Sequence, residues 1–123
     1  MRVDRADRDR GAATVFVLAI GLTLVVAGLA SASIGTARVG RHQARSAADL
    51  GALAGASEAI YGQLAVCDRA GRFVSANGGD MTLCVVDGLE VTVRAEVEVH
   101  PMPGLTRHAT AKARAGPVYA VVD

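Results

Sequence analysis

The sequence predicts an α+β chain in which a long N-terminal helix precedes a small three-stranded antiparallel sheet. The first 65 residues contain a long apolar run and no Pro, which favours continuous helix. The remainder alternates apolar and polar residues between turn signals, as half-buried strands do. We expect four consecutive segments: a polar leader at 1–10, a transmembrane helix at 11–37, a helix extension at 38–65 and a small α+β domain at 66–123.

The composition excludes several classes of function. The net charge is +1, the Arg residues are scattered and Trp is absent, so nucleic acid is not an expected partner. His42, His100 and His108 have no nucleophile or carboxylate at a catalytic spacing, and Asp49 and Glu58 lie on opposite sides of a helix. No metal-ligand spacing is present either. We therefore expect no enzymatic activity, no cofactor, no metal and no small-molecule substrate.

The apolar run predicts a membrane span. Residues 11–37 carry no charged side chain, and about 20 helical residues cross the hydrocarbon core. A buried helix is not expected, because the rest of the chain is too small to cover it on all sides. The alternative is a signal peptide cut near the small residues at 30–33, which would remove residues 1–32. Four Arg before the run and three soon after it favour an N-terminus inside the cell.

Small residues recur along this run at a seven-residue spacing. Gly21, Gly28 and Gly35 would lie near one face, and small residues let another membrane helix approach closely. Beyond the run we expect a nearly continuous helix to about Leu64, in which Gly40, Gly51 and Gly55 also allow a kink or break. Larger residues at helical spacing there predict an Ala/Leu stripe that covers the sheet: Leu50, Leu53, Ala54, Ser57, Ile60, Tyr61 and Leu64.

The C-terminal part predicts a short second helix and three strands. Val66, Ala70, Phe73 and Val74 would share one helix face, and the Asn-Gly pair at 77–78 would end that helix. Asp-Gly at 87–88 predicts a hairpin, residues 100–105 a loop, and 106–116 a third strand. The inward faces would hold two alternating sets, namely Leu89, Val91, Val93, Ala95, Val97 and Val99, then Ala109, Ala111, Ala113 and Ala115.

The two cysteines have two interpretations. If this part of the chain is exported, Cys67 and Cys84 form a disulfide that joins the second helix to the first strand. If it is cytoplasmic, they are two small reduced side chains.

Three stretches of the sequence resemble a known family. They are "RGAATVFVLAIGL", "QARSAADLGALAGA" and "SANGGDMTLCVVDGLEVTVRAEVEV". In this order they resemble the TadE/TadG-like proteins of Flp (Tad) pilus systems, closest to the short actinobacterial TadE-like branch. The resemblance implies a pilin-like fold and a minor pilin or pseudopilin-like component of pilus assembly or secretion. It implies a single span in the cell membrane with the C-terminal domain outside. The implied partners are the lipid bilayer and other pilus or secretion-system membrane proteins, including TadE-like subunits.

The resemblance also implies a processing site. In processed members a prepilin peptidase cuts after a Gly, which here places the bond between Gly11 and Ala12. Type IV pilins usually carry Glu five residues into the mature chain, and this sequence has Phe16 there. An uncut, membrane-resident assembly factor therefore stays open beside a processed minor pilin. So do the small secreted protein described above and a membrane-anchored binding module unrelated to pili.

Overall fold

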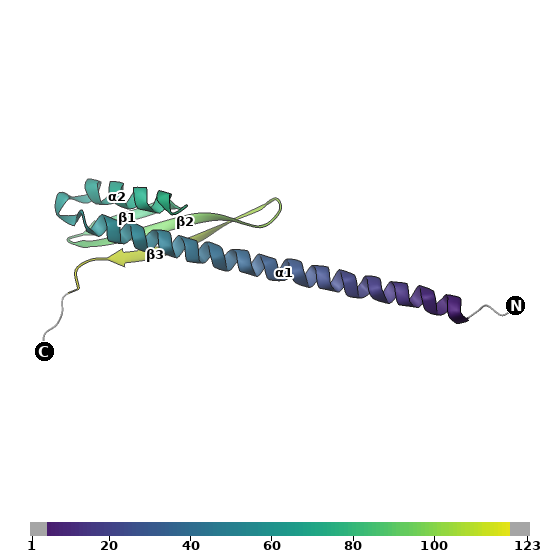
Figure 1. Cartoon of the computed structure of the whole chain (residues 1–123). Helices are drawn as coiled ribbons and strands as arrows, with labels where there is room; N and C mark the ends of the chain where they lie inside the picture. Colours follow the sequence, from purple (N-terminus) through teal and green to yellow (C-terminus); the bar gives the residue numbers. More distant parts are fainter. Residues whose placement is uncertain (1–4, 119–123) are drawn as a thin grey trace, which may run out of the picture. The chain divides into compact units, whose positions relative to one another are not determined.

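A computed structural model describes residues 5–118, and for residues 5–8 only the helical backbone. Its elements are α1 (Arg5–Ala56), the 3-10 turn η1 (Ala59–Tyr61), α2 (Gln63–Ala76), β1 (Asp80–Asp87), β2 (Glu90–Met102) and β3 (Leu105–Ala115) (Figure 1). The predicted α+β class, with a long helix before a three-stranded antiparallel sheet, is confirmed. The first four residues of the expected leader lie outside the described part. The chain forms two compact units, Met1–Ile34 (unit 1) and Gly35–Asp123 (unit 2).

Unit 1 is helical throughout its described part, from Arg5 onward. Its side chains are exposed from Asp9 to Ala32, although most of them are apolar. The hydroxyls of Thr14, Thr23 and Ser31 each donate to the carbonyl oxygen four residues earlier, at 2.8–3.0 Å. These polar groups are therefore satisfied inside the helix, as an apolar surrounding requires.

The sheet of unit 2 has the strand order β1-β2-β3, and both pairings are antiparallel. Gly88 and Leu89 connect β1 to β2, and the positive φ of 60° at Gly88 suits the first position of a type II′ turn. Pro103 and Gly104 connect β2 to β3, with a positive φ of 80° at Gly104, as at the second position of a type II turn. Both hairpins are therefore closed by two-residue turns.

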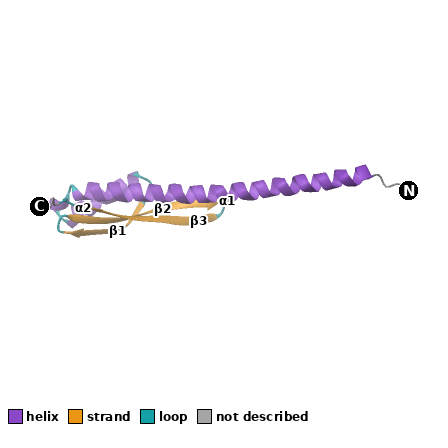
Figure 2. Cartoon of the chain, turned by 90° about the horizontal axis from the view of Figure 1, so that it is seen from below, coloured by secondary structure: helices purple, strands orange, loops and turns teal. Residues whose placement is uncertain are grey.

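The helices of unit 2 lie on one face of this sheet (Figure 2). Valine and alanine side chains of β2 and β3 form the sheet's contribution to the core, and Val91 and Val93 are fully buried. α2 contributes Val66, Ala70 and Val74. From α1 come only small residues, namely Gly40, Ala44, Ala47, Ala48, Gly51, Ala52 and Gly55.

The inward face of α1 differs from the prediction. The expected Ala/Leu stripe is mostly outside the core: Leu53 is 63% exposed and Leu64 is 90% exposed. The reason is the close approach of the layers. A Cβ built on Gly55 would lie 3.2 Å from Ala70 Cβ and 3.2 Å from Val66 Cγ1, so a large side chain has no room there. Size, rather than hydrophobicity alone, selects which face of α1 packs.

The expected continuation of the helix to Leu64 is also wrong, because α1 ends at Ala56. The Ser57 hydroxyl donates to the Ala54 carbonyl at 2.7 Å, and the Glu58 amide donates to the Gly55 carbonyl at 2.9 Å. Gly62 then adopts φ 95° and ψ 172°, a conformation that other residues rarely take. This break lets α2 pack on the same core.

Three details of the C-terminal predictions are corrected by the structure. Leu89 lies in the first turn, 45% exposed, rather than inward on a strand. Residues 100–102 belong to β2, so the loop expected at 100–105 is only the turn at 103–104. Phe73 is 40% exposed instead of sharing the buried face of α2, and the Arg69 guanidinium lies 5.6 Å from its ring centroid. The second helix, the hairpin and the inward Ala set of β3 are confirmed.

Candidate functional site: an exposed apolar helix and the surfaces of the second unit

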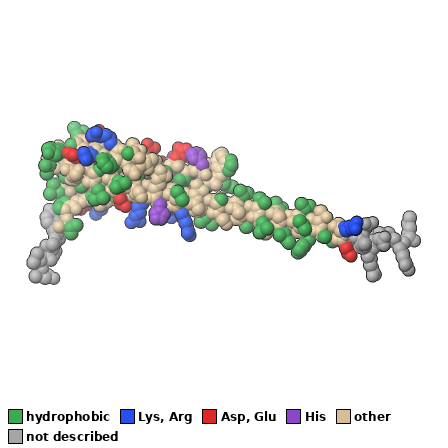
Figure 3. Space-filling view, in the orientation of Figure 1, with side chains coloured by type: hydrophobic (Ala, Val, Ile, Leu, Met, Phe, Trp, Pro, Cys, Tyr) green, Lys and Arg blue, Asp and Glu red, His purple; other side chains and the backbone are tan. Residues whose placement is uncertain are grey.

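The apolar part of α1 is the most unusual surface of the chain. An 18-residue window of this helix has a mean hydropathy of 2.5, and none of the window is buried. The side chains of Phe16 and Leu22, for example, are each 67% exposed. Figure 3 shows hydrophobic side chains along this segment, with charged side chains at its N-terminal end. The helix is long and apolar enough to cross a membrane.

The predicted small-residue face lies on this exposed surface. A Cβ built at Gly21, Gly28 or Gly35 would meet nothing within 4 Å. None of the three glycines is therefore needed for packing within the described part of the chain. This contrasts with Gly51 and Gly55, where the added carbon would meet α2.

The residues of the predicted processing site also lie on α1. Gly11 and Ala12 are exposed, and a Cβ built at Gly11 meets nothing within 4 Å. Phe16 lies little more than one helical turn further on and is equally exposed. All three residues are therefore exposed on α1.

The two cysteines are joined in unit 2. Cys67 of α2 and Cys84 of β1 form a disulfide with a sulfur–sulfur distance of 2.04 Å and a sequence separation of 17. The bond lies at the rim of the core, where Cys84 packs against it. It links α2 to an edge strand that would otherwise be held by β2 and by side-chain packing.

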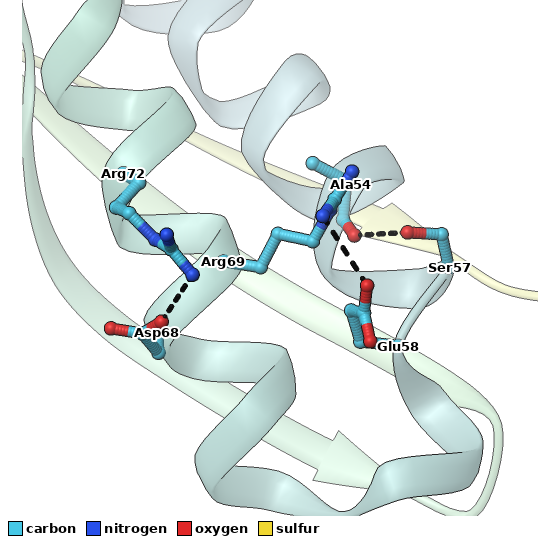
Figure 4. Close-up of polar contacts among 6 residues, drawn as sticks. All are labelled: Ala54, Ser57, Glu58, Asp68, Arg69 and Arg72. Carbon is cyan, nitrogen blue, oxygen red and sulfur yellow. Dashed lines mark hydrogen bonds and ion pairs between the residues drawn. The ribbon is translucent and has the colours of Figure 1, made fainter.

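The junction between α1 and α2 carries the polar contacts drawn in Figure 4. Arg69 of α2 pairs with Glu58 of the connecting segment at 3.3 Å, and Arg72 pairs with Asp68 within α2 at 2.6 Å. Both contacts are at least partly exposed, only the Arg69–Glu58 pair joins α2 to the connecting segment, and neither forms a reactive site.

The histidines do not assemble catalytic groups. His100 Nε2 lies 3.0 Å from Glu98 Oε1, and His108 Nδ1 lies 2.9 Å from Glu96 Oε1, on the exposed face of the sheet. His42 is exposed on α1. Within residues 9–118, whose side chains the structure describes, no group of three His, Cys, Asp or Glu is arranged to hold a metal ion.

A basic groove lies along the outer edge of β3, and the sequence analysis missed it. Its volume is about 440 Å³, and Arg41 and Arg45 of α1 and Lys112 of β3 contribute its positive charge. Arg41 and Arg45 are one helical turn apart, which sequence spacing shows. Lys112 lies beside these two arginines because of the way α1 packs across the sheet. Sequence spacing does not predict that packing.

The chain thus has one long, exposed apolar helix, a small α+β unit, and no assembled catalytic centre among its described residues. Residues 11–58 match the Tad family model, which represents Flp pilus-assembly TadE/G-like proteins. Over these residues the chain is similar to the TadE/G-like proteins of Flp pilus assembly. No curated protein and no solved structure matches the chain.

The fold shows where the residues of the family match lie. Its second half contains "QARSAADLGALAGA", the stretch from Gln43 to Ala56. In the structure the Ala and Gly residues of this stretch form the inward face of α1 in unit 2. The first half of the match is the exposed apolar segment. The matched region therefore combines a segment suited to lipid with the surface on which α2 and the sheet pack.

Proposed function

We propose that the protein is a non-catalytic, single-pass membrane component of a Tad/Flp-type pilus assembly or secretion system, acting as a minor pilin or pseudopilin-like subunit. Residues 11–37 cross the membrane, the N-terminus lies in the cytoplasm and the part of unit 2 after residue 37 lies outside. Its partners are the bilayer and other membrane proteins of the same system, including TadE-like subunits.

The observation that carries this proposal is the wholly exposed apolar segment of α1 inside the family match. In water such a surface is unfavourable, at about 25 cal/mol for each Å² of apolar area. In lipid the exposed apolar surface carries no such free-energy cost. The hydroxyls of Thr14, Thr23 and Ser31 donate hydrogen bonds within the helix, so these three donors are satisfied.

Two further features support the orientation. Arg residues precede the span in greater number than they follow it closely. The Cys67–Cys84 disulfide in unit 2 suits an oxidising compartment outside the cytoplasm.

The orientation can be tested on the single lysine of the chain. Lys112 is exposed on β3 and is the only side-chain amine in the sequence. A membrane-impermeant amine reagent added to intact cells is expected to modify Lys112 and to leave the N-terminal amine unmodified. Lys112→Arg is the matched control, because it keeps the charge and removes the reactive amine. Modification of Lys112 only after the cells are opened would overturn the orientation.

Intact mass of the membrane-extracted protein tests the form of the anchor. Loss of residues 1–11 identifies a processed minor pilin, and a full-length mass identifies an uncut assembly component. Loss of residues 1–32, with the product in the soluble fraction, contradicts the proposal and supports a secreted protein.

A further inference from the structure

The end of unit 2 nearest the apolar run can be located from contacts between α1 and β2. A Cβ built on Gly51 would lie 3.5 Å from Val93, and one built on Gly40 would meet Val99. β2 therefore runs opposite to α1 across the core. Met102 lies three residues beyond Val99 on β2, but the register shifts there, and the paired residues on β3, Arg107 and Leu105, are only two apart. At the rise of a strand, two residues advance about 7 Å, which corresponds to about four or five residues of helix. The turn between β2 and β3 is thus level with the first residues of unit 2.

This turn is apolar and exposed. Residues 101–106 contain no charged side chain, and Met102 and Leu105 are 50% and 38% exposed. The turn between β1 and β2 is different, because Asp87 and Glu90 flank it. In Figure 1 the β2–β3 hairpin extends beyond β1, so these apolar side chains have no strand of β1 beside them.

Three arginines surround the same end of unit 2. Arg38 and Arg41 flank Gly40 on α1, and Arg107 pairs in register with Val99, the residue that meets Gly40. All three are exposed, and none makes an ion pair with another described residue. Side chains of a helix lean toward its N-terminus, here toward the apolar run. A nearby carboxylate, Glu98, lies 3.0 Å from His100.

We propose that this end of unit 2 binds the surface of a bilayer that contains anionic phospholipid. Met102 and Leu105 enter the headgroup region beside α1, and Arg38, Arg41 and Arg107 bind lipid phosphates. Apolar side chains that enter the headgroup boundary and cations at the phosphate level are the two elements of interfacial binding. The proposal rests on the membrane anchoring proposed above and adds that the outer unit is held against the membrane rather than free above it.

The absence of Trp from the sequence provides a specific probe. Leu105→Trp places one indole at the β2–β3 turn, and Leu89→Trp is the matched control at the opposite turn of β2. Each full-length variant is reconstituted in phosphatidylcholine vesicles with or without phosphatidylglycerol, containing phospholipids brominated on the acyl chains. We expect brominated lipid to quench Leu105→Trp at least about twofold when phosphatidylglycerol is present and to leave Leu89→Trp unchanged. Iodide in the water should quench Leu89→Trp more strongly.

The arginines are tested in the Leu105→Trp background. Arg38→Gln, Arg41→Gln and Arg107→Gln together are expected to lower the ratio of bound to free unit 2, by about fivefold for each charge removed. The control removes three charges elsewhere in the unit, by Arg72→Gln, Arg94→Gln and Arg114→Gln. Equal quenching in the two triple variants would overturn the role of the arginines.

Flotation of the vesicles separates this inference from the membrane anchor. If the protein floats with the vesicles but Leu105→Trp is not quenched, or is quenched no more than Leu89→Trp, the binding of unit 2 to the bilayer is overturned and the anchor stands. If the protein does not float, the anchor itself fails.

Discussion

Gly51 of α1 lies directly against Val74 of α2. A Cβ built on Gly51 would come within 2.6 Å of Val74 Cγ2 and 3.2 Å of the Ala70 carbonyl oxygen. Val74 is fully buried, so its side chain has little freedom to move away. This contact sets how closely the two helices approach, and it lies in the Ala/Gly stretch that matches the TadE/G-like family.

Gly51→Ala is therefore expected to destabilise unit 2. Overpacking of a core costs about 1–3 kcal/mol, and the better helix propensity of Ala returns up to about 1 kcal/mol. The expected net loss is about 1–2 kcal/mol, measured as a lower denaturation midpoint of the full chain in detergent micelles. Gly35→Ala is the control, because its Cβ meets nothing within 4 Å. Equal midpoints for the two variants would contradict the packing described here.

The face of α1 that packs in unit 2 could not be predicted from hydrophobic periodicity. Leu50 and Leu53 fall at helical spacing with other apolar residues, and the pattern favours them over Gly51 and Ala52. The valines of β2 and α2 already fill the core, so only the smallest residues of α1 fit between them. Periodicity reports which residues are apolar, whereas the structure also depends on the distance between layers.

The sheet was predictable because apolar and polar residues alternate regularly along its strands. Alternation along β2 and β3 is strict, and the inward residues Val93, Ala95 and Ala113 have polar neighbours on both sides. Strand register is set in part by two short turns with Gly at the position that needs a positive φ. The register shifts between Met81 and Leu83 and between Val99 and Met102 were not predicted. The apolar character of the N-terminal part of α1 was predicted from the same sequence, and within the described chain a Cβ at Gly21 or Gly28 meets nothing within 4 Å.

Breaking the Cys67–Cys84 disulfide is expected to lower the stability of unit 2 by about 3 kcal/mol, because closing a loop of this length restricts the unfolded chain. Cys67→Ser with Cys84→Ser should show this loss as a lower denaturation midpoint in detergent. The wild type under reducing conditions should approach the same midpoint. An unchanged midpoint in both cases would show that β1 is held by its pairing with β2 and by side-chain packing, without a contribution from the disulfide.

The ion pair between Arg114 and Glu90 is expected to matter little for stability. Arg114 Nε lies 3.1 Å from Glu90 Oε1, but the two side chains are 72% and 49% exposed. Exposed cross-strand pairs contribute at most about 1 kcal/mol. Arg114→Gln should therefore change the denaturation midpoint far less than Val93→Ala, which removes two buried methyl groups at a cost of about 2 kcal/mol. The reverse order would mean that the charged face of the sheet, rather than its valine face, determines stability.

The last prediction concerns the small-residue face of the membrane segment. Gly28→Leu places a large side chain where a Cβ now meets nothing, so the fold of unit 2 and its denaturation midpoint should not change. If this face packs against another membrane helix, the substitution prevents close approach and association in the bilayer should fall. Val26→Leu is the control, because Val26 lies on nearly the opposite side of the helix and is already large. Energy transfer between labelled copies in vesicles measures association between copies of this chain, and cross-linking in native membranes extends the measurement to other proteins. Equal association for Gly28→Leu and Val26→Leu in both measurements would show that these glycines face only lipid.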